Sequence, residues 1–81
     1  MKARVVWHEE VRPLLTEMPA AESELIFEKL DLLQRYPRMY SVIGKGRFRR
    51  HRRFLAGNWI VYYRFVEGIV YIRAVWPARI P

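Results

Sequence analysis

The sequence contains no cysteine, and only four glycines and two histidines stand among its 81 residues. Without cysteine there is no disulfide and no thiolate metal site, and His8 and His51 are the only soft ligands left. Gly44-Lys45-Gly46 lacks the full spacing and the final Lys-Ser/Thr of a phosphate-binding loop, so we interpret it as a flexible turn. We therefore expect neither a metal nor a cofactor.

Long apolar runs are also missing. The opening MKARVVWHEE has no apolar core of a signal peptide, and the longest apolar stretch, WIVYY at 59–63, is far short of the roughly 20 residues that span a bilayer. We expect a cytoplasmic protein that does not bind membranes. A chain of this length has room for one small core, so residues 1–81 are expected to form a single domain.

Acidic residues are nearly missing from the second part of the chain, and the two parts differ in the sign of their net charge. Residues 1–31 carry four bases and seven acids, a net charge of −3, whereas residues 32–81 carry eleven bases and one acid, a net charge of +10. A basic surface attracts polyanions and speeds their encounter. Nucleic acid is therefore the first partner to consider, ahead of anionic lipid or an acidic protein segment.

Apolar periodicity predicts an α+β domain of the order β-α-α-β-β-β. Strands are expected at 3–8, 48–55, 58–66 and 69–76, and helices at 9–17 and 19–35. Glu67-Gly68 is short enough for a tight hairpin in which glycine accepts a positive φ. We expect an N-terminal strand, a two-helix hairpin and a three-stranded antiparallel meander, with the helices packed on one face of the sheet.

Alternation with a period of two assigns the side chains of the last two strands to faces. The face toward the helices is expected to carry Trp59, Val61, Tyr63 and Phe65 on one strand, and Val70, Ile72, Ala74 and Trp76 on the next. A small domain needs such large apolar side chains in its core, so Trp7 is expected there as well. The opposite face is then expected to carry Tyr62, Arg64, Tyr71 and Arg73.

The most basic segment is GKGRFRRHRRF at 44–54, with six Lys or Arg, one His and two Phe. On a strand, Arg49, His51 and Arg53 point to one face, where they meet Arg64 and Arg73; a one-residue bulge points Arg50 and Arg52 there instead. Like charges this close repel unless an anion neutralises them. A solvated, aggregation-resistant edge strand is the alternative, but it needs only one or two charges. We therefore favour polyanion binding.

Two residue types on the basic face suggest chemistry. An unperturbed imidazole can exchange protons near neutral pH, so His51 is a candidate for acid–base chemistry; arginines around it are expected to favour a general base, although a merely solvated histidine fits equally well. Tyr62 and Tyr71 are candidates for stacking on unpaired bases. His8, at a strand-to-helix boundary beside two glutamates, is interpreted as a helix-entry residue without chemistry. No catalytic Ser, Cys or carboxylate pair is apparent.

The succession of elements and residues resembles the RelE/ParE superfamily of bacterial type II toxins. The resemblance rests on LLQRYP ending the helical hairpin, the basic RRHRRFL, and the closing NWIVYYRFVEGIVYIRAVWPAR. It implies a small α+β fold and a cognate, acidic antitoxin. It also implies one of two activities: RelE-like members cut mRNA in the ribosomal A site by activating the ribose 2′-OH, whereas ParE-like members bind DNA gyrase and are not nucleases.

The chemistry favours the first activity, because transfer at a phosphorus needs positioned positive charge more than a covalent nucleophile. By position in the resemblance, Arg53 and Arg79 are expected at the scissile phosphate. His51 is the candidate base on chemical grounds alone, since it matches no residue of the family pattern. The residues expected to bind RNA or ribosomal RNA are Lys45, Arg47, Arg49, Arg50, Arg52, Tyr62, Arg64, Tyr71 and Arg73. Many relatives have a polar residue near Trp76, so a gyrase inhibitor or a basic RNA-binding module stays open as an alternative.

Overall fold

The computed structural model of the protein describes residues 2–78 and confirms the expected order of elements. The elements are β1 (Arg4–Trp7), α1 (Val11–Glu17), α2 (Ala20–Arg35), β2 (Arg52–Ala56), β3 (Trp59–Val66) and β4 (Ile69–Pro77). Pro19 stands at the N-cap of α2, where its missing N–H costs no helical bond, and the helix ends at Arg35 before Tyr36-Pro37.

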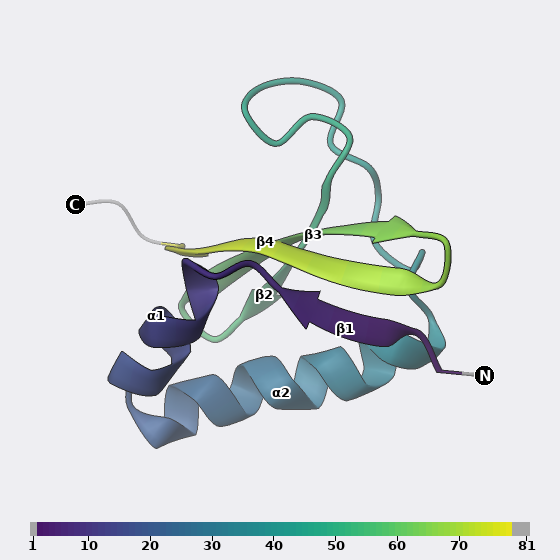
Figure 1. Cartoon of the computed structure of the whole chain (residues 1–81). Helices are drawn as coiled ribbons and strands as arrows, with labels where there is room; N and C mark the ends of the chain where they lie inside the picture. Colours follow the sequence, from purple (N-terminus) through teal and green to yellow (C-terminus); the bar gives the residue numbers. More distant parts are fainter. Residues whose placement is uncertain (1, 79–81) are drawn as a thin grey trace.

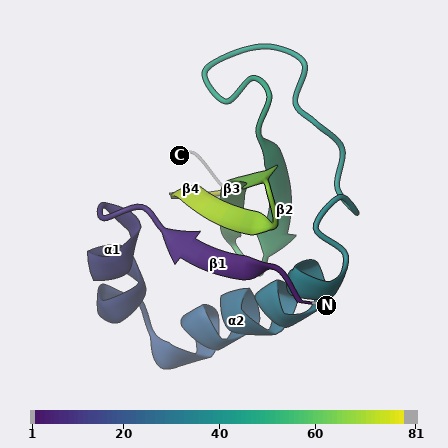
Figure 2. The same cartoon turned by 45° about the vertical axis from the view of Figure 1, so that its right-hand side comes forward.

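The four strands form one sheet in the order β1-β4-β3-β2. Strands β2, β3 and β4 make the expected antiparallel meander, and β1 pairs in parallel with β4. Both helices lie on the same face of the sheet, and the segment between α2 and β2 rises above the other face (Figures 1 and 2). We call these the helix face and the open face. The turn between β3 and β4 has positive φ at Glu67 (49°) and Gly68 (79°), which confirms the tight hairpin.

The main core lies between the sheet and α2. Ile26, Leu30 and Leu33 of α2 pack against Val61 and Tyr63 of β3 in one buried cluster. Tyr63 has no exposed surface, and its hydroxyl donates to the carbonyl of Pro37 at 2.9 Å. Burial raises the pKa of Tyr63 to about 12. The helix face expected for β3 is therefore confirmed.

A bulge in β4 changes the faces expected for its second half. Tyr63 pairs with Ile72 but Tyr62 pairs with Ala74, so Arg73 is the extra residue opposite this step. Beyond the bulge every side chain changes face, because the period along a strand is two. The expectation that Ala74 and Trp76 face the helices is therefore wrong: Ala74 packs on the open face, and Trp76 is 41 % exposed.

The strand expected at 48–55 begins only at Arg52. Residues 47–50 form a turn, in which Gly46 and Arg50 have positive φ (92° and 72°). These left-handed residues reverse the chain and prevent an extended run. The alternation expected from Phe48 to His51 is therefore wrong, and it holds only from Arg52 onward.

Candidate nucleic-acid interface

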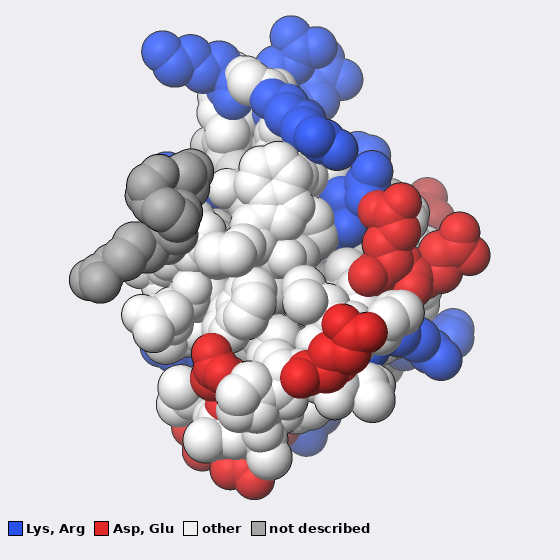
Figure 3. Space-filling model, turned by 90° about the vertical axis from the view of Figure 1, so that its left-hand side faces the viewer, with Lys and Arg blue, Asp and Glu red and all other residues white. Residues whose placement is uncertain are grey.

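The basic residues 44–51 form a loop that stands above the open face, here called the basic loop (Figure 1). Its base is closed by two backbone hydrogen bonds, from the Ile43 N–H to the His51 carbonyl at 2.8 Å and from the Arg50 N–H to the Ile43 carbonyl at 2.9 Å. Lys45, Arg47 and Arg49 are exposed on it. Lys and Arg side chains gather at this end of the molecule in Figure 3, whereas Asp and Glu lie lower down.

Phe48 anchors the basic loop to the sheet. Its ring is buried against Tyr62, with ring centroids 4.0 Å apart, and its edge meets Trp76 at 4.9 Å. The guanidinium carbon of Arg47 lies 5.2 Å from the Trp76 ring centroid, a cation–π distance. A second small core, formed by Phe48, Tyr62 and Ala74 with Ile43 and Ile60, therefore covers part of the open face.

A hollow of about 910 Å³ lies on the uncovered part, and we call it the open-face hollow. Its lining residues are Val6, Trp7, His8, Glu9, His51, Arg64, Val66, Tyr71, Ile72 and Arg73. They come from β1, the residues after it, β3, β4 and the end of the basic loop. The sheet thus collects segments far apart in the sequence around one cavity.

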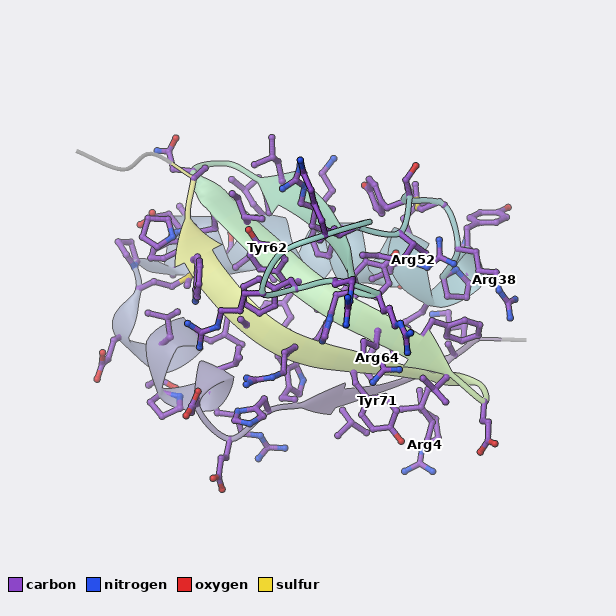
Figure 4. The ribbon with its side chains drawn as sticks, turned by 90° about the horizontal axis from the view of Figure 1, so that it is seen from above. Arg4, Arg38, Arg52, Tyr62, Arg64 and Tyr71 are labelled. Carbon is purple, nitrogen blue, oxygen red and sulfur yellow. The ribbon has the colours of Figure 1, made fainter. Side chains whose placement is uncertain are left out.

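Strand register explains why these side chains meet. Arg64 of β3 is paired with Tyr71 of β4, which in turn is paired with Val6 of β1. Figure 4 shows Arg64 and Tyr71 side by side, with Arg4 beyond them, while Tyr62 lies under the loop. Arg73, two residues after Tyr71 and at the bulge, also lines the hollow, and Tyr71 is 40 % exposed. The fold therefore brings together four residues that were expected on the open face: His51, Arg64, Tyr71 and Arg73.

The arginines of the hollow have no acidic partner within the described part of the chain. The ion pairs among residues 2–78 are Lys2 with Asp31 and His8 with Glu10. Arg64 and Arg73 thus form no ion pair within these residues, although Glu9 lines the same hollow. Their planar guanidinium groups suit an oxyanion ligand, above all phosphate, which they bind with paired N–H donors.

The ring of His51 is oriented by the backbone. Its Nδ1 lies 3.2 Å from the carbonyl oxygen of Arg49. A carbonyl only accepts hydrogen bonds, so Nδ1 carries the hydrogen in this contact and Nε2 of the neutral ring keeps its lone pair. That arrangement leaves Nε2 able to accept a proton, on a residue that lines the hollow.

The other residues predicted for the site do not line the open-face hollow. Arg52 is on the helix side, where its guanidinium donates to the carbonyls of Tyr40 and, at 3.4 Å, of Arg38. Arg53 is paired with Tyr62 and therefore lies on the open face, as expected, but it lines a different hollow, with Lys29 and Leu55 among its neighbours. The expectation that Tyr62 offers a free stacking face is wrong, because Phe48 covers it and 8 % of it is exposed. Arg50 is exposed on the basic loop, and Arg79 lies outside the described residues.

Sequence reasoning missed three residues on this face. His8 and Glu9 line the open-face hollow, and Arg4 extends its basic edge on β1 (Figure 4). They reach the site because β1 pairs with β4 and the His8 N–H donates to the Ile72 carbonyl at 2.9 Å. For Arg4 and His8 the available signal was the spacing Arg4-x-Val6-x-His8, which places them on one face of a strand, and Glu9 follows directly in the chain.

Within residues 2–78, no group of three His, Asp or Glu side chains is arranged to hold a metal ion. No helix in the same part of the chain is long and apolar enough to cross a membrane.

Comparison with known proteins shows what the fold is similar to. The archaeal RelE–RelB complex from Pyrococcus horikoshii OT3 contains a chain that matches with a TM-score of 0.76, at 21 % identity, over 96 % of this chain and 97 % of that one. A double arginine-to-alanine mutant of the E. coli toxin RelE in the free state also matches with a TM-score of 0.76, at 14 % identity, over 96 % and 85 % of the two chains. No curated protein matches the sequence significantly.

Residues 14–80 match the model of the ParE toxin family of type II toxin–antitoxin systems, parDE. This match covers most of the chain, and the two RelE structures share its fold over nearly its whole length. The protein is therefore a member of the ParE toxin family, a RelE/ParE superfamily toxin of a type II toxin–antitoxin system.

Proposed function

We propose that this toxin is an endoribonuclease that cuts mRNA on the ribosome through the ribose 2′-OH, with the open-face hollow as its active site. The observation that carries the proposal is the convergence of Arg64, Arg73 and His51 in one cavity, with no acidic partner for the arginines in the described chain. The fold shared with RelE supports it as well.

Each step has a group suited to it. His51 Nε2 takes the proton of the 2′-OH, whose oxygen then attacks the neighbouring phosphorus. Negative charge grows on the phosphoryl oxygens, and Arg64 and Arg73 stabilise it. The bond from phosphorus to the 5′-oxygen breaks, which leaves a 2′,3′-cyclic phosphate and, once protonated, a 5′-hydroxyl. No metal and no covalent enzyme intermediate is required.

Binding is shared among three regions. Tyr71, exposed at the floor of the hollow, offers a ring face to a base. Lys45, Arg47, Arg49 and Arg50 on the basic loop hold phosphates of mRNA or ribosomal RNA. Arg53, predicted at the scissile phosphate, instead holds a flanking phosphate, because it lines a separate hollow. An acidic cognate antitoxin is expected to neutralise the same basic end of the molecule (Figure 3).

The test is controlled expression in bacteria, with growth followed and the 5′ ends of cellular mRNA mapped in the first minutes. The wild type should stop growth and produce cuts inside translated messages, and Arg73→Ala should abolish both. Arg35→Ala removes the same charge at the end of α2 and should act like the wild type. Arg53→Ala should keep most of the activity. Growth arrest with intact mRNA would overturn the nuclease proposal.

Inhibition of DNA gyrase is the second candidate. Two observations favour it: the family description is that of ParE, and α2 exposes the large apolar side chains Leu25, Phe27 and Leu32. Leu25 and Leu32, seven residues apart, share one side of α2, and exposed apolar side chains placed in this way are suited to binding a protein rather than RNA. In that case toxicity should survive Arg73→Ala, disappear with Leu32→Ser, and be accompanied by a DNA-damage response.

A further inference from the structure

A second imidazole faces the proposed active site. His8 follows β1 and lines the open-face hollow together with His51. Its backbone is tied to β4 beside the bulge, through the 2.9 Å hydrogen bond to the Ile72 carbonyl. Its side chain is 34 % exposed, so the ring is accessible to a ligand. The hollow therefore has one histidine from the β1 end and one from the basic loop.

The two imidazoles are held by opposite kinds of hydrogen bond. The Glu10 N–H donates to Nδ1 of His8 at 3.2 Å, so in this contact Nδ1 is an acceptor and the ring hydrogen is on Nε2. His51 instead donates from Nδ1 to the Arg49 carbonyl, which leaves a lone pair on Nε2. One Nε2 can thus give a hydrogen bond and the other can accept a proton.

His8 also has a partner for its protonated form. The Glu10 carboxylate oxygen Oε2 lies 3.9 Å from the same Nδ1. The 3.2 Å bond belongs to the neutral ring, and the longer ion pair belongs to the imidazolium, in which Nδ1 must donate. The charged or titratable groups around His8 are Glu9 and Glu10 beside it, Arg64, Tyr71 and Arg73 on the sheet, and His51 on the basic loop.

We propose that His8 is the general acid of the cleavage reaction, an inference that rests on the proposed nuclease function. His51 takes the proton of the 2′-OH as the 2′-oxygen bonds to phosphorus. As the bond from phosphorus to the 5′-oxygen breaks, protonated His8 gives its Nε2 proton to that oxygen. The RNA therefore loses one proton to His51 and gains one from His8, and the two histidines end with exchanged protonation states.

A purely structural role for His8 is the competing explanation, because its side chain caps the turn that leads into α1. The substitution His8→Asn separates the two roles. An asparagine side-chain oxygen accepts the backbone N–H two residues on, so the turn keeps its hydrogen bond. Asparagine does not exchange protons near neutral pH, so the acid is lost.

The experiment is single-turnover cleavage of an mRNA on purified ribosomes by the full-length wild type and by His8→Asn. The variant should bind ribosomes equally well and cleave about 10²- to 10⁴-fold more slowly. The wild-type rate should fall at low pH, where His51 is protonated, and at high pH, where His8 is deprotonated. His8→Asn should lose only the fall at high pH.

A second substrate tests the acid directly. Sulfur in place of the 5′-oxygen at the mapped cleavage site leaves without a proton, so His8→Asn should cleave this RNA within about threefold of the wild-type rate. If His8→Asn matches the wild type on the ordinary RNA, or if sulfur restores nothing, the role of His8 is overturned while the nuclease stands. If the wild type cleaves neither RNA, the proposed function fails, and the role of His8 fails with it.

Discussion

The ring of Phe48 stacks on the ring of Tyr62, with centroids 4.0 Å apart and planes inclined by 16°. This contact joins the most basic segment of the chain to the sheet. It turns GKGRFRRHRRF from a charged strand into an anchored loop, and it buries the tyrosine expected to stack on RNA. It also leaves the neighbouring area of β3, β4 and β1 uncovered, which is where Arg64, Tyr71 and Arg73 surround the open-face hollow.

Removal of this anchor should free the basic loop. Phe48→Ala deletes a buried aromatic ring, a change that costs about 3 kcal/mol of unfolding free energy. Denaturant unfolding should show this loss, and trypsin should cut the loop at Lys45 and Arg47 much faster than in the wild type. Arg49→Ala, in the same loop, should change the unfolding free energy by less than about 0.5 kcal/mol. Unchanged trypsin cleavage in Phe48→Ala would show that the loop is held by other contacts.

Arg50 is strained by its backbone conformation. Its φ of 72° lies in the left-handed region, which costs a non-glycine residue about 1–2 kcal/mol. Arg50→Gly removes this cost. Glycine has greater freedom in the unfolded chain, however, and this lowers the gain in unfolding free energy by about 0.5–1 kcal/mol. We expect a net gain of about 0.5 kcal/mol in denaturant unfolding. Arg50→Ala loses the same charge but keeps the Cβ atom, so an equal gain there would attribute the effect to charge.

The neighbours Arg52 and Arg53 should differ in what they support. Arg52 donates to the carbonyls of Tyr40 and Arg38, which hold the turn after α2 against β2. Arg52→Met leaves these carbonyls without their donor and should cost about 1–3 kcal/mol of unfolding free energy. Arg53→Ala, at an exposed side chain, should cost less than about 0.5 kcal/mol. Equal losses in chemical denaturation would contradict the structural role of Arg52.

The raised pKa of Tyr63 predicts that the stability of the fold decreases at alkaline pH. This pKa is raised by burial from 10.0 to about 12, so the unfolded chain loses this proton first. The contribution of Tyr63 to the unfolding free energy should therefore keep its full value below pH 10. As the pH rises from 10 toward 12, the unfolding free energy should fall by up to about 2–3 kcal/mol because of this group.

Tyr63→Phe isolates that contribution from other groups that titrate in the same range. The variant should be less stable at pH 7 by about 1 kcal/mol, because the Pro37 carbonyl loses its donor. The difference between wild type and variant should then shrink, and reverse in sign, as pH rises above 10. Parallel curves for the two proteins in unfolding titrations would refute the assignment.

Local pattern predicted much of the fold, because its signals lie within single elements. Pro19, Tyr36-Pro37 and the Ile26, Leu30, Leu33 stripe delimit and orient α2, and the Trp59 to Phe65 alternation assigns the faces of β3. The family resemblance, carried by the succession of these elements, agrees with the family match. Arg64, Tyr71 and Arg73 were predicted on the open face for the same local reason, although Arg73 stays there through a bulge.

What the amino-acid sequence determined by itself is the order of elements, the concentration of positive charge in the second half, and the core face of β3, since each depends on neighbours in the chain. Only the tertiary structure decided that Phe48 covers Tyr62, that the β4 bulge moves Ala74 and Trp76 to the open face, and that β1 brings His8 beside Arg73. These features depend on strand order, register and a left-handed turn. Each is a competition between distant segments for the same surface, and its free energy is set only when those segments pack together.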